Sequence, residues 1–364
     1  LGDGHQTRPV VYGLMLGGTA RGKDHALSRI SDFMAATGIA EKIVTGAATS
    51  DSSLYNAHKG ATCARLWLAD EFGQYFKSNR NDSTQHVANV NRALLEMFSA
   101  RNKPQFQGKE YADAKNNYVL RYPHQNLYAV STPGVILENL RPSDVESGLV
   151  GRLLIVGGDD KQKSRKTKYI PPPDDLLAIA KNWYAFQPGA GNLSGFSGGG
   201  ETVVPITPEA QLLMDWFVDV CDERLEMDEK TGALWGRAAE KASQLALISA
   251  CSRITDPARD HTEVTDADYL WAMETVTEVT EWTCRLVDDS ISENNQEATV
   301  KRVLKIIREA GSEGILRSDL SKSTKGIKQP ERDSIIKDLK AMGYITEAVS
   351  QGARGAPAGR FFAS

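Results

Sequence analysis

A glycine-bracketed loop near the start of the chain has the residue types of a phosphate-binding site. The apolar run of residues 10–16 reads as a buried strand, and residues 25–30 resume as a helix. Glycines permit the backbone dihedrals that wrap N–H groups around phosphate oxygens, and a helix N-terminus favours an anion. Lys23 would then reach the β and γ phosphates. The residues that we expect to bind nucleotide here are Gly17, Gly18, Thr19, Ala20, Arg21, Gly22, Lys23, Asp24 and His25.

One position in this loop departs from the usual pattern. A serine or threonine normally follows the lysine, and here Asp24 does. A carboxylate can bind Mg²⁺ directly, yet its charge also faces the phosphates. Two readings follow: a working site with altered metal dependence, which we favour, and a site that the aspartate has switched off.

The dipeptide Asp70-Glu71 follows an apolar strand, 47 residues after Lys23. A carboxylate at a strand tip can hold Mg²⁺, usually through water, and an adjacent carboxylate can polarise the attacking water. We therefore assign Asp70 to the metal, with Asp24 as a second ligand, and Glu71 to the catalytic base. The alternative is that the dipeptide merely ends a strand on the surface.

A further strand ends in Ser131-Thr132, where a hydroxyl would lie beside the γ-phosphate and help to position water. Arg152 precedes the next apolar run and is predicted to stabilise the transferred phosphate on a neighbouring subunit; its alternative is a structural ion pair. Arg237, at a helix start in the second domain, is predicted to reach the nucleotide. The catalytic set is thus Lys23, Glu71, Ser131, Thr132 and Arg152.

The segment of residues 101–123 alternates basic, aromatic and amide residues around expected turns. In a ring-shaped motor such an insertion would point into the pore. There Lys103, Lys109 and Lys115 would follow a phosphate backbone, while Tyr111 would stack on a base. A solvated hairpin without function is the alternative.

The elements that must position these residues fall into three regions. Residues 9–156 alternate short apolar runs, among them 42–44, 65–68, 127–130 and 153–156, with helical stretches, which indicates a parallel sheet covered by helices. Residues 157–175 and 187–201 read as exposed connections. From Thr207-Pro208, an N-cap followed by a first-turn proline, the pattern becomes helical.

The last region, residues 297–364, predicts a small basic module. It holds seven Lys and six Arg against eight acidic residues, a balance of +5 that leaves −9 for the remainder. Two helices come first, a recognition helix over about residues 330–342 follows, and a β-ribbon ends the region. This order of elements predicts a winged helix. Its DNA-binding residues would be Arg332, Lys337 and Lys340 on that helix and Arg354 in the ribbon loop.

Composition places the chain among ordinary globular proteins. It has 364 residues, 41% of them hydrophobic, and four separated cysteines without metal-ligand spacing, which suits a reducing cytoplasm. No apolar run is long enough to cross a bilayer, so a membrane role is not expected. A strand begins within about ten residues of Leu1, which indicates a piece of a longer polypeptide.

Taken in order, these motifs resemble the primase-helicase ATPases of phages and prophages. The shared elements are the glycine-loop strand, "TGAATSDSSLYNAHKG", "LWLADEFGQYF", "GLVGRLLIV" and the helical "RAAEKASQLALISA". The resemblance implies an α/β P-loop NTPase core of AAA+ or RecA-like type over residues 1–175, a helical lid over 176–296 and a winged helix over 297–364.

The resemblance also implies an activity and partners. It points to an ATP- and Mg²⁺-dependent DNA helicase or translocase, acting as a homo-oligomeric ring with single-stranded DNA in the pore and duplex at the winged helix. An upstream primase or polymerase domain would precede it. Two rivals stay open: a nucleotide-controlled origin-binding or regulatory protein with slow or absent ATPase, and a degenerate NTPase that serves as an assembly scaffold.

Overall fold

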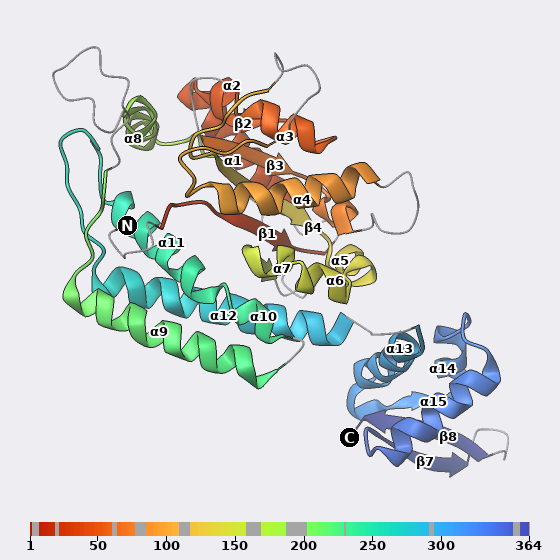
Figure 1. Cartoon of the computed structure of the whole chain (residues 1–364). Helices are drawn as coiled ribbons and strands as arrows, with labels where there is room; N and C mark the ends of the chain where they lie inside the picture. Colours follow the sequence, from red (N-terminus) through yellow and green to blue (C-terminus); the bar gives the residue numbers. More distant parts are fainter. Residues whose placement is uncertain are drawn as a thin grey trace. The chain divides into compact units, whose positions relative to one another are not determined.

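The computed structural model describes residues 1, 7–18, 22–59, 64–76, 85–108, 117–157, 169–186, 202–228, 231–290, 295–351 and 357–363. The chain forms two compact units, residues 1–288 and 289–364, which are described separately (Figure 1). Among the described helices, none has the length and apolarity that a bilayer crossing requires.

A five-stranded parallel sheet organises the first unit. Its order is β2-β3-β4-β1-β5, so β1 lies between β4 and β5. Leu16 at the end of β1 is in register with Ser131 of β4 and with Gly157 of β5. The carboxyl ends of these strands therefore share one edge of the sheet, termed here the carboxyl edge. The strands are β1 (Tyr12–Leu16), β2 (Val44–Thr45), β3 (Ala64–Ala69), β4 (His124–Ser131) and β5 (Leu153–Gly157).

Four of the five predicted strands lie where the apolar runs placed them, and one is displaced. Lys42 and Ile43 were expected in a strand, but they belong to the short helix α2 (Ala40–Ile43), and β2 begins only at Val44. The Lys42 N–H donates to the carbonyl of Ile39, so a local turn takes the backbone that a strand would need. Three apolar residues alone could not distinguish the two.

Helices cover the sheet because their apolar residues recur at helical spacing. In α4 the fully buried side chains of Val90, Leu94 and Met97 share one face. That face meets β1, where the Tyr12 hydroxyl donates to the Leu94 carbonyl at 3.0 Å. The helices of this layer are α1 (Lys23–Thr37), α2, α3 (Asp51–Ala57), α4 (Gln85–Ala100), α5 (Pro133–Asn139), α6 (Pro142–Glu146), α7 (Leu149–Arg152) and α8 (Asp174–Ala185), with a 3₁₀ turn over Phe72–Phe76.

Four further helices, termed here the lid helices, complete the first unit: α9 (Pro208–Met227), α10 (Gly232–Trp235), α11 (Ala238–Ser252) and α12 (Asp266–Ser290). As predicted, Thr207 caps α9, accepting the Ala210 N–H at 3.2 Å. Their apolar core also packs against Leu154 of β5, and the buried Lys241 amine points toward the Leu153 carbonyl at 3.5 Å. These contacts attach the lid helices to the sheet.

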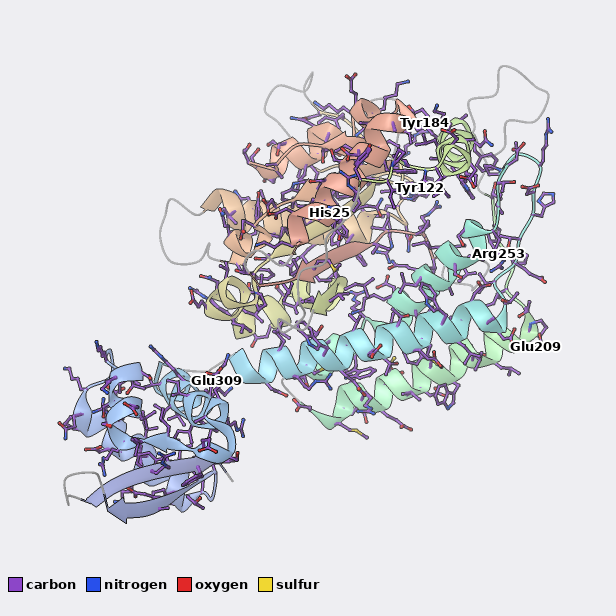
Figure 2. All side chains as sticks on the ribbon, turned by 180° about the vertical axis from the view of Figure 1, so that it is seen from behind. His25, Tyr122, Tyr184, Glu209, Arg253 and Glu309 are labelled. Atoms are coloured by element: carbon purple, nitrogen blue, oxygen red, sulfur yellow. The ribbon has the colours of Figure 1, made fainter. Side chains whose placement is uncertain are left out.

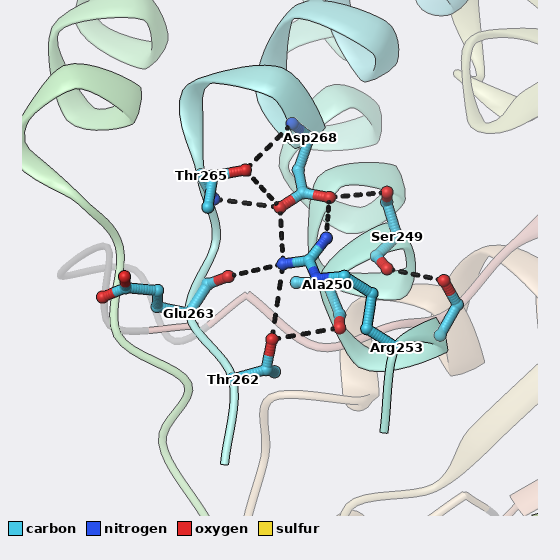
Figure 3. A network of polar contacts seen from close by, with 8 residues as sticks. Ser249, Ala250, Arg253, Thr262, Glu263, Thr265 and Asp268 are labelled. Atoms are coloured by element: carbon cyan, nitrogen blue, oxygen red, sulfur yellow. Dashed lines mark hydrogen bonds and ion pairs between the residues drawn. The ribbon is translucent and has the colours of Figure 1, made fainter. Parts of the chain in front are cut away.

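A polar network secures the start of α12 (Figure 3). The Asp268 carboxylate accepts hydrogen bonds from Arg253, Ser249 and both the backbone and hydroxyl of Thr265. Burial alone raises the pKa of the Asp268 carboxyl, but these donors outweigh burial and hold that pKa well below its usual range. Arg253 extends the network to the Glu263 carbonyl at 2.9 Å.

The second unit has the predicted winged-helix order. An antiparallel sheet, β6-β8-β7, packs against three helices around a core that includes Val303, Ile307, Leu339 and Phe361. Its elements are α13 (Asn295–Glu309), β6 (Ile315–Leu316), α14 (Arg317–Ser323), α15 (Gln329–Ala341), β7 (Ile345–Gln351) and β8 (Pro357–Ala363). The chain thus has a mixed α/β core with lid helices, and a second unit with the element order of a winged helix.

Candidate functional site

The glycine loop leaves β1 at the carboxyl edge and leads directly into α1. The Gly17 N–H donates to the Ser131 carbonyl at 3.1 Å, which ties the start of the loop to β4. Residues 19–21, predicted to contact nucleotide, lie outside the described residues. Gly22 precedes α1 with φ 84°, a left-handed conformation that favours glycine. Glycine offers no side-chain acceptor to the first turn of α1, so those N–H groups are suited to an anion.

Lys23 and Glu71, 48 residues apart in the chain, meet at this edge. Lys23 Nζ lies 2.7 Å from Glu71 Oε1. The lysine side chain is 10% exposed and that of the glutamate 42%. The parallel strands β1, β4 and β3 end at the same edge of the sheet. This brings Lys23, at the start of α1, next to Glu71, which follows β3.

The backbone at Glu71 adopts an uncommon conformation. Its φ is 50°, which few residues other than glycine adopt and which costs about 1–3 kcal/mol. Asp70 compensates in part, because its Oδ1 accepts the Glu71 N–H at 2.8 Å. Such strain is concentrated at functional sites, where the surrounding structure over-determines the backbone. Here it aims the Glu71 side chain at Lys23.

The two hydroxyls at the end of β4 have different surroundings. Ser131 is fully buried, and its Oγ accepts the Gly73 N–H at 3.2 Å. A Cβ at Gly73 would lie 2.7 Å from that oxygen, so glycine is needed there. Thr132 precedes α5, and its side chain does not cap that helix. Of the two predicted hydroxyls, Thr132 is thus the one whose side chain is not engaged by the turn after β3.

Asp24 and His25 lie exposed on the first turn of α1, and His25 is labelled there in Figure 2. Within the described residues no group of three His, Cys, Asp or Glu side chains is placed to hold a metal ion. Mg²⁺ rarely needs one, since it commonly binds through one or two carboxylates, waters and substrate phosphates. Asp24 and Asp70 supply carboxylate oxygens of that kind at the carboxyl edge. The donor chemistry therefore fits Mg²⁺ bound together with a nucleotide.

Arg152 lies at the opposite edge of the sheet. It ends α7 immediately before Leu153, which is in register with Tyr12 at the start of β1. Four residue steps along β1 separate that level from Leu16, or about 13 Å. The Arg152 guanidinium donates to the Gly148 carbonyl at 2.9 Å, and burial, followed by repulsion from Arg237, lowers its pKa. Arg152 is thus remote from its own glycine loop.

Arg237 shares this opposite edge. Its Nη1 lies 3.0 Å from Glu240 Oε2, and its Cγ is 3.8 Å from where a Cβ on Gly151 would lie. The buried Arg101 forms an ion pair with the same glutamate. The sequence predicted that Arg237 reaches the nucleotide, and the lid helices place it beside Gly151, next to Arg152. Sequence spacing gave no signal for this cluster, because Arg101 and Glu240 are 139 residues apart.

An antiparallel bridge closes the base of the hairpin that precedes β4. Phe106 and Leu120 exchange backbone hydrogen bonds at 2.8 and 2.9 Å. Lys103 at its base is exposed, whereas Lys109, Tyr111 and Lys115 lie outside the described residues. The hairpin packs on α3, where Gly108 closely approaches the Tyr55 ring.

On the winged helix, the predicted DNA-binding side chains differ in availability. Arg332 does not point outward as predicted, because it donates to Thr324 Oγ1 and to the Ile327 carbonyl at 3.5 and 3.4 Å. Lys340 is paired with Glu347 of β7 at 2.6 Å. Lys337 is exposed on α15, and Arg354 lies outside the described residues. Sequence periodicity located the outer face of α15 but not the acceptors beside it.

No protein-family model matches the chain, and no curated protein matches it. Among solved structures, it is similar to the Aeropyrum pernix Orc1 protein in complex with DNA, with 13% sequence identity and a TM-score of 0.21. The match covers 99% of this chain and 85% of that chain.

Proposed function

We propose that this chain is a Mg²⁺-dependent ATPase that acts on DNA, as the helicase or translocase module of a phage or mobile-element replication protein. The observation that carries the proposal is the meeting of Lys23 and Glu71 at the carboxyl edge, 2.7 Å apart, where the glycine loop enters α1. A cation that holds phosphate and a side chain that orients the attacking water are recurring parts of phosphoryl-transfer sites, and groups of both kinds are present at one place.

Each residue at the carboxyl edge would have a separate role in ATP hydrolysis. Lys23 and the N–H groups at the start of α1 would bind the phosphates, and Asp70 with Asp24 would hold Mg²⁺, which neutralises phosphate charge. Lys23 must leave Glu71 to contact a phosphate oxygen. The same exchange would free the Glu71 carboxylate to orient the attacking water, with the Thr132 hydroxyl beside it. Substrate binding would therefore release the base.

The arginines at the opposite edge support action on a neighbouring subunit. Arg152 precedes Leu153, which lies four residue steps or about 13 Å along β1 from the level of Leu16, and Arg237 lies beside Gly151. This position, away from the glycine loop of the same chain, supports a role at the phosphates of another subunit. Burial, and repulsion from Arg237, lower the pKa of Arg152 and of Arg101, and an incoming phosphate would favour the charged form of both. In a homo-oligomeric ring, this edge would face the nucleotide of the next subunit.

Two surfaces would contact DNA. The hairpin base with Lys103 would face single-stranded DNA in the pore, and the basic winged helix would bind duplex through phosphate contacts. The rival function is a nucleotide-controlled origin-binding protein, which would bind duplex without unwinding it. Unwinding of a forked DNA by the wild-type chain separates the two functions.

The test is the ATPase rate with and without single-stranded DNA, on a sample of known oligomeric state. Lys23→Ala should abolish hydrolysis and weaken ATP binding. Deleting residues 297–364 should spare basal ATPase but weaken duplex binding and flatten its salt dependence. An inactive wild type that also fails to bind ATP would overturn the proposal, and unchanged duplex affinity after the deletion would remove the winged helix from it.

A further inference from the structure

An indole from the lid helices lies directly against the backbone at the end of β5. A Cβ on Gly157 would be 2.1, 2.6 and 2.7 Å from three ring atoms of Trp282. No side chain fits there unless the ring moves, so Trp282 of α12 is in contact with the Gly157 backbone. The indole itself is half-buried.

The contact lies one strand away from the glycine loop. Gly157 is in register with Leu16, the residue immediately before Gly17. Adjacent strands are about 4.8 Å apart, so the indole is a side chain of the lid helices placed beside the start of the loop.

The arrangement of the carboxyl edge decides which end of a bound nucleotide faces Trp282. Glu71, Asp70 and Thr132 follow β3 and β4, which lie on one side of β1. Because these groups act on the γ-phosphate, the terminal phosphate must lie on that side. The nucleoside then leaves the loop on the other side of β1, and β5 with Trp282 is the strand there.

We propose that Trp282 forms the wall of the nucleoside subsite and stacks on the purine base of the nucleotide held by the glycine loop. This inference rests on the proposed function. Gly157 is a positioning residue in it, because its lack of a Cβ lets the ring lie at the strand end. An aromatic ring stacked on a base strengthens binding about tenfold, which favours a large indole at this place.

The test separates the base from the phosphates by measuring two dissociation constants on the full chain, one for ATP and one for inorganic tripolyphosphate. Trp282→Ala should weaken ATP binding about tenfold and leave tripolyphosphate within about twofold of wild type. Trp282→Phe should retain most of the ATP affinity. Gly157→Ala should resemble Trp282→Ala, because it displaces the ring without removing it.

Matched controls come from the same chain. Trp271 lies eleven residues earlier on α12 and is 48% exposed, so Trp271→Ala should change neither constant. Gly46→Ala serves the same purpose for Gly157→Ala, because a Cβ at Gly46 would meet nothing within 4 Å.

The possible results are distinct. Equal loss of ATP and tripolyphosphate affinity in Trp282→Ala would show that the indole only supports the loop, and full ATP affinity would show that it does not contact the base. Either result overturns the inference while leaving the proposed ATPase intact. A wild type that binds neither ligand would instead overturn the proposed function.

Discussion

The ion pair between Lys23 and Glu71 predicts that removing the glutamate charge tightens nucleotide binding while it stops hydrolysis. In the structure the ammonium of Lys23 is committed to Glu71 at 2.7 Å. ATP must break this contact before its phosphates can take the lysine. Glu71→Gln removes that cost and also removes the base that orients water.

The size of the effect follows from distance and exposure. Two unit charges 2.7 Å apart attract by about 1.5 kcal/mol in water. Measured exposed pairs contribute about 0.2–1 kcal/mol, and the 42% exposure of Glu71 places this pair in that screened range. We therefore expect about 0.5–1 kcal/mol, or roughly twofold to fivefold tighter ATP binding.

The assay is a titration of ATP into wild-type chain and Glu71→Gln, paired with steady-state ATPase measurements. Glu41→Gln provides the control, because it removes the same charge from the exposed surface of α2. The gain in affinity should shrink as salt is raised, since the pair it removes is partly exposed to solvent.

Two results would refute this reasoning. Unchanged or weaker ATP affinity in Glu71→Gln would show that the lysine is not held back from phosphate by the glutamate. Normal turnover in the same variant would remove Glu71 from the role of base, whatever its affinity.

Three further predictions concern other parts of the chain. Asp24→Asn should need several-fold more Mg²⁺ for half-maximal ATPase while Asp24→Thr stays active; an inactive wild type rescued by the threonine would show a switched-off motor. Arg152→Ala should lose activity that is partly recovered in mixed assemblies with Glu71→Gln subunits, and absence of complementation would argue against action on a neighbour. Asp268→Asn should lower the free energy of unfolding at pH 7 by about 3 kcal/mol, because it unpairs Arg253 and the start of α12. Since folding lowers the Asp268 pKa, its stabilisation is complete above the unfolded pKa near 4 and is lost progressively as the pH falls from there through the much lower folded pKa. Urea unfolding of both proteins at pH 7, 5 and 3 should therefore give the same difference at pH 7 and 5 and a smaller one at pH 3, and a constant difference would contradict this.

Local features of the structure were readable from the sequence. The apolar run before the glycine loop is β1, and Gly22 has the positive φ that a glycine permits. Thr207 caps α9 as its residue type and the following proline predicted. These features depend on hydrogen bonds and burial within a few residues, which side-chain type and spacing report directly.

Which side chains meet was decided by the tertiary structure. Lys23 could be assigned to phosphate from its motif, but only the strand order places it against Glu71. The contact of Trp282 with Gly157 left no trace in either segment, because it joins a helix to a strand far away in the chain. Arg237 lies at the opposite edge because the buried apolar residues of α11 set the orientation of that helix. The position of the arginine follows from that packing. Sequence periodicity indicates which face of a helix or strand is buried. Packing among segments distant in the sequence decides which other element covers that face, and this packing in turn fixes which polar side chains meet.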